Sequence, residues 1–322
     1  EGRCFSYATN AIYQMWVDAL RNWLDAAHDA LPVGVRDTLR ARVYELCPDC
    51  ADDVYPFLAR MMSLPLDAGA EARLRGIEGE GLQVLTFRAV ETWLERAAQK
   101  APQVLACEDL HWADPTSLEL LRRLMALTDR LPILLVCIFR PEMEHPCWQI
   151  KETAARHYAH RHTDLWLRPL SAGESAQLVG SLLCIEDLPA RLRDRVLDRA
   201  EGNPFYVEEI LRSLIDVGAI AYDGVSGRWQ ATREVSELAL PDTLREVLLA
   251  RIDRLPREAR QVLQLASIIG RIVPQSLLAA ITPASLATLD EHLLTLQREQ
   301  MLRERVRVPE ATYIFKHQLT QE

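Results

Sequence analysis

The chain has 322 residues, with 37 Lys and Arg against 46 Asp and Glu, which gives a formal net charge of −9. This length allows roughly two domains with cores of their own, and the composition is that of a folded protein rather than a disordered or fibrous one. An acidic chain is a poor constitutive binder of a nucleic-acid backbone. The longest apolar run, residues 133–139, is far shorter than the ~20 residues that a membrane-spanning helix needs.

Cysteine usage and the first residue add two expectations. The seven cysteines are scattered and no signal peptide opens the chain, so reduced thiols in a cytoplasmic protein are the simplest interpretation. Cys47-Pro48-Asp49-Cys50 has the spacing of a redox pair, but neither a βαβ pattern nor a second pair for zinc accompanies it. We interpret it as a chance pair in a helical segment. Because the first residue is Glu1 and not Met, the chain is expected to begin inside a larger protein.

The first hundred residues are predicted to be mainly helical, because apolar residues recur at helical spacing from Trp16 and again from Val54. Glycines and small residues at 68–81 predict a loop, followed by a helix around Trp93.

Between residues 103 and 170 the pattern changes to short apolar runs. The runs at 104–107 and 133–139 are unalternating, which is typical of parallel strands covered on both faces, and 164–167 is a third candidate strand. Asp114 as N-cap and Pro115 at the first helical position predict a helix between the first two runs. Strand, helix and strand together form a βαβ unit.

From residue 171 onward the pattern is mainly helical. Ser171 and Glu174 have the spacing of a capping box, Asn203-Pro204 begins a helix that Gly218 ends, and turn residues at 223–227 predict a hairpin around Trp229. Three further helices and a terminal hairpin, which includes the alternating Arg303, Arg305 and Arg307, form a winged-helix pattern; the helices are expected at 242–254, 256–269 and 285–299.

Two adjacent carboxylates, Glu108 and Asp109, follow the first predicted strand. In open α/β folds, ligands bind at the carboxyl edge of the sheet, where these side chains are expected. A nucleoside triphosphatase uses such acids to hold Mg²⁺ and to orient or deprotonate the attacking water. On these residues alone, a charged turn after a strand is an equally good interpretation.

The surrounding residues resemble a known family. Glu108-Asp109-Leu110-His111-Trp112-Ala113-Asp114-Pro115 resembles the Walker B region of a bacterial branch of the STAND ATPases, which are AAA-related P-loop proteins. Phe139-Arg140-Pro141-Glu142 resembles the family's sensor 1 strand end, Gly202-Asn203-Pro204-Phe205 its lid motif, and residues 315–322 the end of its winged helix. The resemblance implies an α/β fold: a partial P-loop NTPase parallel sheet with helices in residues 1–168, a helical lid in 169–239 and a winged helix in 240–322.

The resemblance also implies a role for single residues, each beside a structural alternative. Glu108 and Asp109 would be the catalytic, Mg²⁺-binding Walker B pair, with the division of roles left open. Arg140 would sense the γ-phosphate, or is a helix-capping or surface arginine. Pro204 would press on the adenine side of the nucleotide, or only begins its helix. His317 would contact the ADP β-phosphate, or is a core histidine.

One part of the family pattern is absent. The phosphate-binding loop, Gly-x-x-x-x-Gly-Lys-Ser/Thr, needs a lysine after a glycine. Lys100, Lys151 and Lys316 are the only lysines, and none of them follows a glycine. Glu1-Gly2-Arg3-Cys4-Phe5-Ser6-Tyr7 resembles the family's strand after its first nucleotide-binding helix. Since the family places the loop just upstream of that strand, we expect a missing upstream P-loop segment, without which the chain would hold Mg·ATP poorly.

The expected function is an ATP/ADP-dependent conformational switch, with ATP binding and slow hydrolysis, in a bacterial signal-transduction or transcriptional regulator. The expected partners are nucleotide, the upstream segment and an unseen output or sensor domain, such as a cyclase, kinase, TPR or LuxR-type domain. The alternatives are a winged-helix DNA-binding regulator and a nucleotide-free interaction scaffold. Residues 241–322 carry 11 Lys and Arg against 10 Asp and Glu, a net charge of +1, which argues against direct DNA contact.

Overall fold

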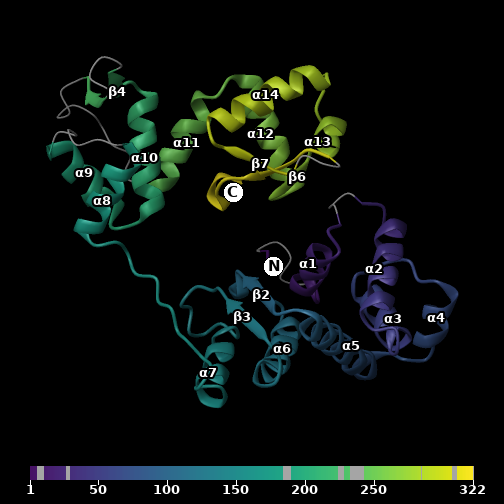
Figure 1. The fold of residues 1–322 in the computed structure, drawn as a ribbon. Coiled ribbons are helices and arrows are strands. Elements are labelled where there is room, and N and C mark those ends of the chain that lie inside the picture. Colours follow the sequence, from purple (N-terminus) through teal and green to yellow (C-terminus); the bar gives the residue numbers. More distant parts are fainter. Residues whose placement is uncertain are drawn as a thin grey trace. The chain divides into compact units, whose positions relative to one another are not determined.

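A computed structural model describes residues 1–5, 11–26, 30–183, 190–223, 228–232, 243–283, 285–306 and 310–321. These residues form two compact units, Glu1–Asp164 and Leu165–Glu322 (Figure 1). The first unit has one hydrophobic core cluster and the second has two. Within the described ranges, no helix combines the length and the apolar character that crossing a membrane requires.

A three-stranded parallel sheet lies in the first unit. Its strands β1 (Gly2–Arg3), β2 (Gln103–Glu108) and β3 (Ile133–Cys137) lie in the order β1-β2-β3. The helix between the last two strands, α6 (Pro115–Leu124), begins as predicted, because the Asp114 side chain accepts a hydrogen bond of 2.9 Å from the backbone N–H of Ser117. The predicted βαβ unit is therefore confirmed.

Most of the remaining helices of the first unit precede β2 in the sequence. They are α1 (Gln14–Trp23), α2 (Pro32–Leu46), α3 (Ala51–Met61), α4 (Ala68–Leu74), α5 (Gly79–Lys100) and α7 (Trp148–His157). The expected loop at 68–81 is wrong in part, since α4 occupies its first half. Asp67 caps this helix by accepting a hydrogen bond of 2.9 Å from Ala70, and the alanines that follow favour a helix.

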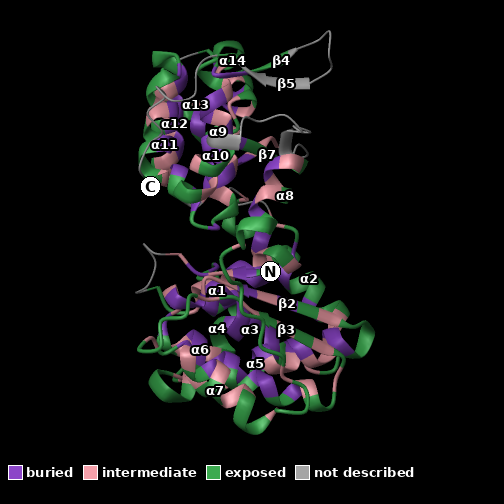
Figure 2. Cartoon of the chain, turned by 90° about the vertical axis from the view of Figure 1, so that its left-hand side faces the viewer, coloured by how far each residue is buried: buried purple, intermediate pink, exposed green. Residues whose placement is uncertain are grey.

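One face of the sheet is left uncovered by the described residues. Leu105 and Cys107 are buried in the core, whereas Ala106 between them is half-buried and Val104 is exposed. Figure 2 colours the sheet by burial. The large apolar side chains of that face are 36 to 67% exposed, and they are Val104, Leu134, Val136 and Ile138. The expectation of a sheet covered on both faces is therefore wrong for the described part of the chain.

The prediction of a third strand at 164–167 is also wrong. This segment has no regular secondary structure, and Leu165 and Leu167 are 85% and 98% exposed. A strand requires a neighbouring strand for its backbone hydrogen bonds, and no described strand pairs with the outer edge of β3. An apolar pattern alone was not enough to form the strand.

The second unit begins with three helices and a hairpin, namely α8 (Ala172–Leu183), α9 (Ala190–Ala200), α10 (Pro204–Asp216), β4 (Ile220–Asp223) and β5 (Arg228–Ala231). The capping box is confirmed: the backbone N–H of Ser171 donates to the Glu174 carboxylate at 2.8 Å, and that of Glu174 donates to the Ser171 hydroxyl at 3.3 Å. The predicted turn residues 224–227 lie outside the described residues.

The rest of the second unit combines helices with a small antiparallel sheet. The elements are α11 (Leu244–Arg254), α12 (Arg257–Ile269), β6 (Ile272–Pro274), α13 (Gln275–Ile281), α14 (Leu286–Arg298), β7 (Leu302–Val306), β8 (Thr312–Phe315) and α15 (Gln318–Gln321). The sheet order is β6-β8-β7. The three predicted helices and the hairpin are present, whereas β6 and α13 were not predicted. Arg307 of the expected alternation lies outside the described residues.

Candidate functional site

The two adjacent acids lie at the carboxyl end of β2. Glu108 is the last residue of the strand, and Asp109 follows with a positive φ of 58° before a 3₁₀ turn over Leu110–Trp112. The backbone N–H of Leu110 donates to the Ile138 carbonyl at 3.1 Å, and the N–H of Ile138 donates to the Cys107 carbonyl at 2.9 Å. These bonds join the ends of β2 and β3, so residues that follow either strand lie at one edge of the sheet.

Arg3 on the neighbouring strand β1 forms an ion pair with Glu108. The register places the two residues opposite each other. The Arg3 Nε atom lies 2.8 Å from Glu108 Oε2, and Nη2 donates to the same oxygen. No local pattern in the sequence predicts a role for Arg3, because 105 residues separate the two partners and only the strand register reveals their contact.

A buried histidine lies beside the acids. His111 is 5% exposed, and in the described part of the chain neither ring nitrogen has a hydrogen-bond partner. Burial lowers the pKa of His111, and the positive charge of Arg140 lowers it further. Arg140 is exposed three residues beyond β3. The structure thus brings Glu108, Asp109 and Arg140 to the same end of the sheet, together with a neutral imidazole that the sequence analysis did not single out.

In the second unit, Gly202-Asn203-Pro204 forms the start of α10. Gly202 has a φ of +76°, and a Cβ atom there would lie 2.3 Å from the Leu170 carbonyl oxygen. The Asn203 side chain caps the helix by accepting a hydrogen bond of 3.0 Å from the backbone N–H of Phe205, and Pro204 occupies the first helical turn. Helix initiation therefore accounts for the three residues of the motif, and Pro204 itself is exposed.

His317 packs against the residue that follows Pro204. The rings of His317 and Phe205 have centroids 3.6 Å apart and planes 33° apart. Burial lowers the pKa of His317 to about 4, and the positive charge of Lys316 contributes to the shift, so the imidazole is neutral at neutral pH. The Nε2 atom is buried without a hydrogen-bond partner among the described residues. Through Phe205, the structure brings the predicted residues Pro204 and His317 into one neighbourhood.

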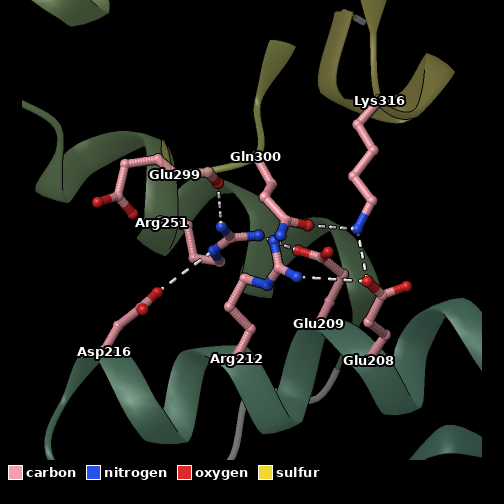
Figure 3. A network of polar contacts seen from close by, with 8 residues as sticks. All are labelled: Glu208, Glu209, Arg212, Asp216, Arg251, Glu299, Gln300 and Lys316. Atoms are coloured by element: carbon pink, nitrogen blue, oxygen red, sulfur yellow. Dashed lines mark hydrogen bonds and ion pairs between the residues drawn. The ribbon is translucent and has the colours of Figure 1, made fainter. Parts of the chain in front are cut away.

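A polar network surrounds this neighbourhood (Figure 3). Lys316 Nζ lies 2.8 Å from the Gln300 side-chain oxygen and also pairs with Glu208 on α10. Arg212, one turn further along α10, lies 3.3 Å from the same carboxylate. Burial alone would raise the pKa of Glu208, but the hydrogen bond and positive charge of Lys316 outweigh it and lower that pKa.

The buried part of the network is centred on Arg251 of α11. Its guanidinium pairs with Glu209, lies 3.4 Å from Asp216 and donates a hydrogen bond of 2.6 Å to the backbone carbonyl of Glu299. The side chains of Arg251 and Glu209 are 2% and 1% exposed. These contacts join α10, α11 and the turn after α14 (Figure 3). No local sequence pattern predicts these pairs.

The donor set at the end of β2 fits Mg²⁺. Carboxylate oxygens are the protein ligands that Mg²⁺ prefers, and this ion usually takes its remaining ligands from water and phosphate. Arg3 forms an ion pair with the Glu108 carboxylate, whereas the Asp109 carboxylate has no ion-pair partner within the described ranges. No group of three or more His, Cys, Asp or Glu suited to a metal gathers anywhere in those ranges. The residues therefore supply at most two ligands, and no Gly-Lys sequence is present for a phosphate-binding loop.

Comparison with known families agrees with this geometry. Residues 1–136 match the AAA ATPase domain. This AAA-type segment contains β1, β2, both acids and most of β3. The match supports an AAA-type P-loop ATPase domain and a nucleotide-dependent activity. Residues 171–225 match a domain of unknown function (DUF8739), which spans α8, α9 and α10.

One curated relative extends the comparison beyond the AAA-type segment. Over 280 residues the chain is 32% identical to an uncharacterized protein of Rhizobium meliloti (strain 1021). The aligned part covers 83% of this chain and 25% of that protein. The chain thus spans about a quarter of the length of the relative, and the similarity continues past the residues that match the AAA ATPase domain.

Proposed function

We propose that the chain is the central part of a STAND-type nucleotide switch in a bacterial signal-transduction or transcriptional regulator. The observation that carries the proposal is the position of Glu108 and Asp109 at the carboxyl end of the middle strand of a parallel sheet, inside the segment that matches the AAA ATPase domain. Ligands of open α/β sheets bind at this edge.

Within this proposal Glu108 and Asp109 have different roles. Glu108, which Arg3 holds in place, binds Mg²⁺ directly or through water. Asp109 has no ion-pair partner in the described ranges, so we assign it to the attacking water, which it orients and deprotonates. Arg140 is exposed at the same edge, where its guanidinium senses the charge of a γ-phosphate. Mg·ATP supplies the phosphoanhydride bond whose hydrolysis resets the switch.

We assign residues 169–239 to a helical lid and 240–322 to a winged helix, with Pro204 and His317 as nucleotide contacts. The contact between Phe205 and His317 supports this pairing, as does the buried, unpartnered Nε2 atom in the described structure. A difference in affinity for ADP and ATP between closed and open arrangements would then shift the population and release an output domain.

The uncovered face of the sheet supports the proposal of an additional P-loop segment. Parallel sheets are normally covered on both faces, yet Leu134 and Val136 are exposed and the outer edge of β3 has no described partner. We propose that an upstream strand pairs with this edge, that its following helix covers the exposed face, and that the loop between them cradles the phosphates. The segment at 164–167 would gain the strand partner that it lacks.

The test uses a longer version of the protein that includes the proposed upstream P-loop segment. We expect Mg²⁺-dependent ATP binding and a slow turnover that Asp109→Asn lowers by about 100-fold, because the substituted amide cannot take the proton. Asp37→Asn, at an exposed carboxylate of α2, is the matched control and should leave turnover unchanged. Turnover at background level in the longer protein, or an Asp109→Asn variant as active as the parent, would show that the proposal is wrong.

A further inference from the structure

Cys47 and Cys50 lie at the corner between two helices. Cys47 directly follows α2, and Cys50 is the residue before α3. The backbone N–H of Cys50 donates to the Cys47 carbonyl at 3.1 Å, which closes a tight turn over Pro48-Asp49. The turn therefore places at one corner two cysteines whose sequence spacing alone carried no function.

The two thiols have different surroundings. Cys47 is fully buried, and its thiol lies 3.4 Å from the Val43 carbonyl oxygen. Burial raises the pKa of Cys47 to about 12, and the contact with Cys50 adds to the shift. Cys50 is only half-buried and is the N-cap residue of an 11-residue helix. Solvent therefore reaches one sulfur and not the other.

Positive charge surrounds the accessible sulfur. The Nη2 atom of Arg96 on α5 lies 4.0 Å from Cys50 Sγ, and the same guanidinium pairs with Asp49. The N-terminus of α3 adds the partial positive charge of its unpaired N–H groups. Cations beside an accessible sulfur are typical of reactive cysteines. Cys50 thus combines access with a neighbouring cation, and Cys47 lies in the same turn.

We propose that Cys47 and Cys50 form a redox-active dithiol that exchanges with low-molecular-weight disulfides. The Cys50 thiolate attacks one sulfur of the reagent, so that a mixed disulfide forms, the reagent's own S–S bond breaks and the first thiolate leaves and takes up a proton. Cys47 then attacks Cys50 Sγ, which forms the Cys47–Cys50 bond and expels the second thiolate, and this leaving thiolate takes up the proton of Cys47. The two cysteines lose two electrons and two protons, and the reagent gains both.

A second thiol pair in the same unit provides an internal comparison. Cys107 and Cys137 lie opposite each other on β2 and β3. Cys107 is 0% exposed inside the sheet. Cys137 is half-buried, as Cys50 is, but in the described part of the chain no cation lies against its thiol as Arg96 lies against Cys50. Because a neighbouring cation favours the reactive thiolate, this pair should oxidise more slowly than Cys47 and Cys50.

The experiment treats the reduced 322-residue chain with excess oxidised glutathione at neutral pH, blocks the remaining thiols by alkylation and maps tryptic peptides by mass spectrometry. One tryptic peptide, residues 43–60, carries both cysteines. We expect this peptide to lose the mass of two hydrogens and to escape alkylation, with reversal by dithiothreitol. The peptides that contain Cys107 and Cys137 should remain alkylated.

Single variants separate the two roles. Cys47→Ser should trap a stable glutathione adduct on Cys50, whereas Cys50→Ser, at the half-buried position, should leave Cys47 unreacted. Arg96→Met should slow adduct formation about three- to tenfold, because it removes the cation beside the thiolate. Arg88→Met, at an exposed position of the same helix, should not change the rate.

Three results would overturn the proposal: two free thiols in peptide 43–60 after treatment, equally fast oxidation of Cys107 and Cys137, or no adduct on Cys50 in the Cys47→Ser variant. Each of these readouts is independent of nucleotide, so failure of the dithiol proposal would not affect the proposed switch function, and the reverse also holds.

Discussion

Arg3 donates two hydrogen bonds to a single carboxylate oxygen of Glu108, across the register pair that joins β1 to β2. Both side chains are partly shielded from solvent, with 16% and 27% exposure. The pair fixes the end of the middle strand and leaves Asp109 as the neighbouring acid without an ion-pair partner in the described ranges. The difference between the two acids therefore comes from a residue about a hundred positions away.

The Arg3–Glu108 pair should contribute measurably to stability. Arg3→Met should lower the free energy of unfolding of the first unit by about 1–2 kcal/mol, because it leaves a partly buried carboxylate without its charged donor. A double-mutant cycle with Glu108→Gln, followed by chemical denaturation, measures the coupling. Glu1→Gln is the matched control, since Glu1 is the more exposed partner of Arg3 at 2.8 Å. A coupling no larger than that of Glu1 would contradict the assignment.

The backbone at Asp109 should restrict which substitutions the site accepts. Its φ of 58° lies in the left-handed region, which Asn and Asp tolerate and β-branched residues do not. Asp109→Val should therefore cost about 1–2 kcal/mol of stability, whereas Asp109→Asn should stay within about 0.5 kcal/mol of the parent. Thermal unfolding of both variants checks this, and equal losses in the two would argue against strain at this position.

Gly202, just before α10, should tolerate substitution less well than Gly218, just after it. Gly202→Ala should destabilise the second unit by about 3 kcal/mol or more, because the added Cβ meets the Leu170 carbonyl oxygen at a residue with positive φ. Gly218 also has a positive φ, of +67°, but a Cβ there meets nothing within 4 Å. Gly218→Ala should therefore cost only about 1 kcal/mol. Hydrogen exchange in α10 would reveal the contrast, and similar effects in both variants would count against the close approach.

Breaking the buried ion pair of Arg251 should be more costly than breaking an exposed one. Arg251→Met should lower stability by about 3–5 kcal/mol, because Glu209 would remain buried without a partner. Arg260→Met removes the more exposed pair with Asp253, at 2.9 Å, and should cost less than about 1 kcal/mol. The double variant Arg251→Met/Glu209→Leu should recover part of the loss, as measured by denaturation; without recovery, an unpaired charge would not be the cause.

Acid should destabilise the second unit through His317. Its pKa is lowered to about 4 in the folded state, so the unfolded chain binds a proton at a pH where the folded one does not. Stability linked to His317 is therefore fully present above its ordinary pKa of 6.5 and is lost as the pH falls from there toward 4. The loss should be at most about 3 kcal/mol.

Comparison of variants isolates this contribution. His317→Phe should flatten the dependence of α10 hydrogen-exchange protection on pH between 6.5 and 4. His157→Gln, at an exposed position in the other unit, should leave the dependence unchanged. Acid also protonates Glu208, which loses its stabilising contact with Lys316, so only the difference between the parent and His317→Phe reports on the imidazole. Identical pH profiles in those two proteins would exclude the histidine as the cause.

The residues around β2 illustrate what could be predicted locally. The apolar run of the strand, the Asp114 cap of α6 and the acids at the strand end depend on neighbours within a few positions. Side-chain periodicity and helix capping act over that range, so the amino-acid order was sufficient. The family motifs extended the prediction to an AAA-type domain, which the match over residues 1–136 supports.

The segment at 164–167 illustrates the limit of that reasoning. Its apolar residues satisfy the pattern of a strand, but a strand needs a second strand to take up its hydrogen bonds, and none is described beside it. The same limit concealed the uncovered face of the sheet, because burial depends on what packs against a residue and not on the residue alone. Coverage of the sheet is a tertiary property.

The amino-acid sequence by itself determined where most helices and strands of this protein lie and which acids follow the middle strand, because these features depend on residues that are close together in the sequence. Only the tertiary structure decided which groups meet. The pairing of Arg3 with Glu108, the burial of Arg251 beside Glu209 and the turn that joins Cys47 to Cys50 all depend on strand register, helix packing or turn geometry. Charge and thiol chemistry act over a few ångströms, so they follow from that packing rather than from residue order.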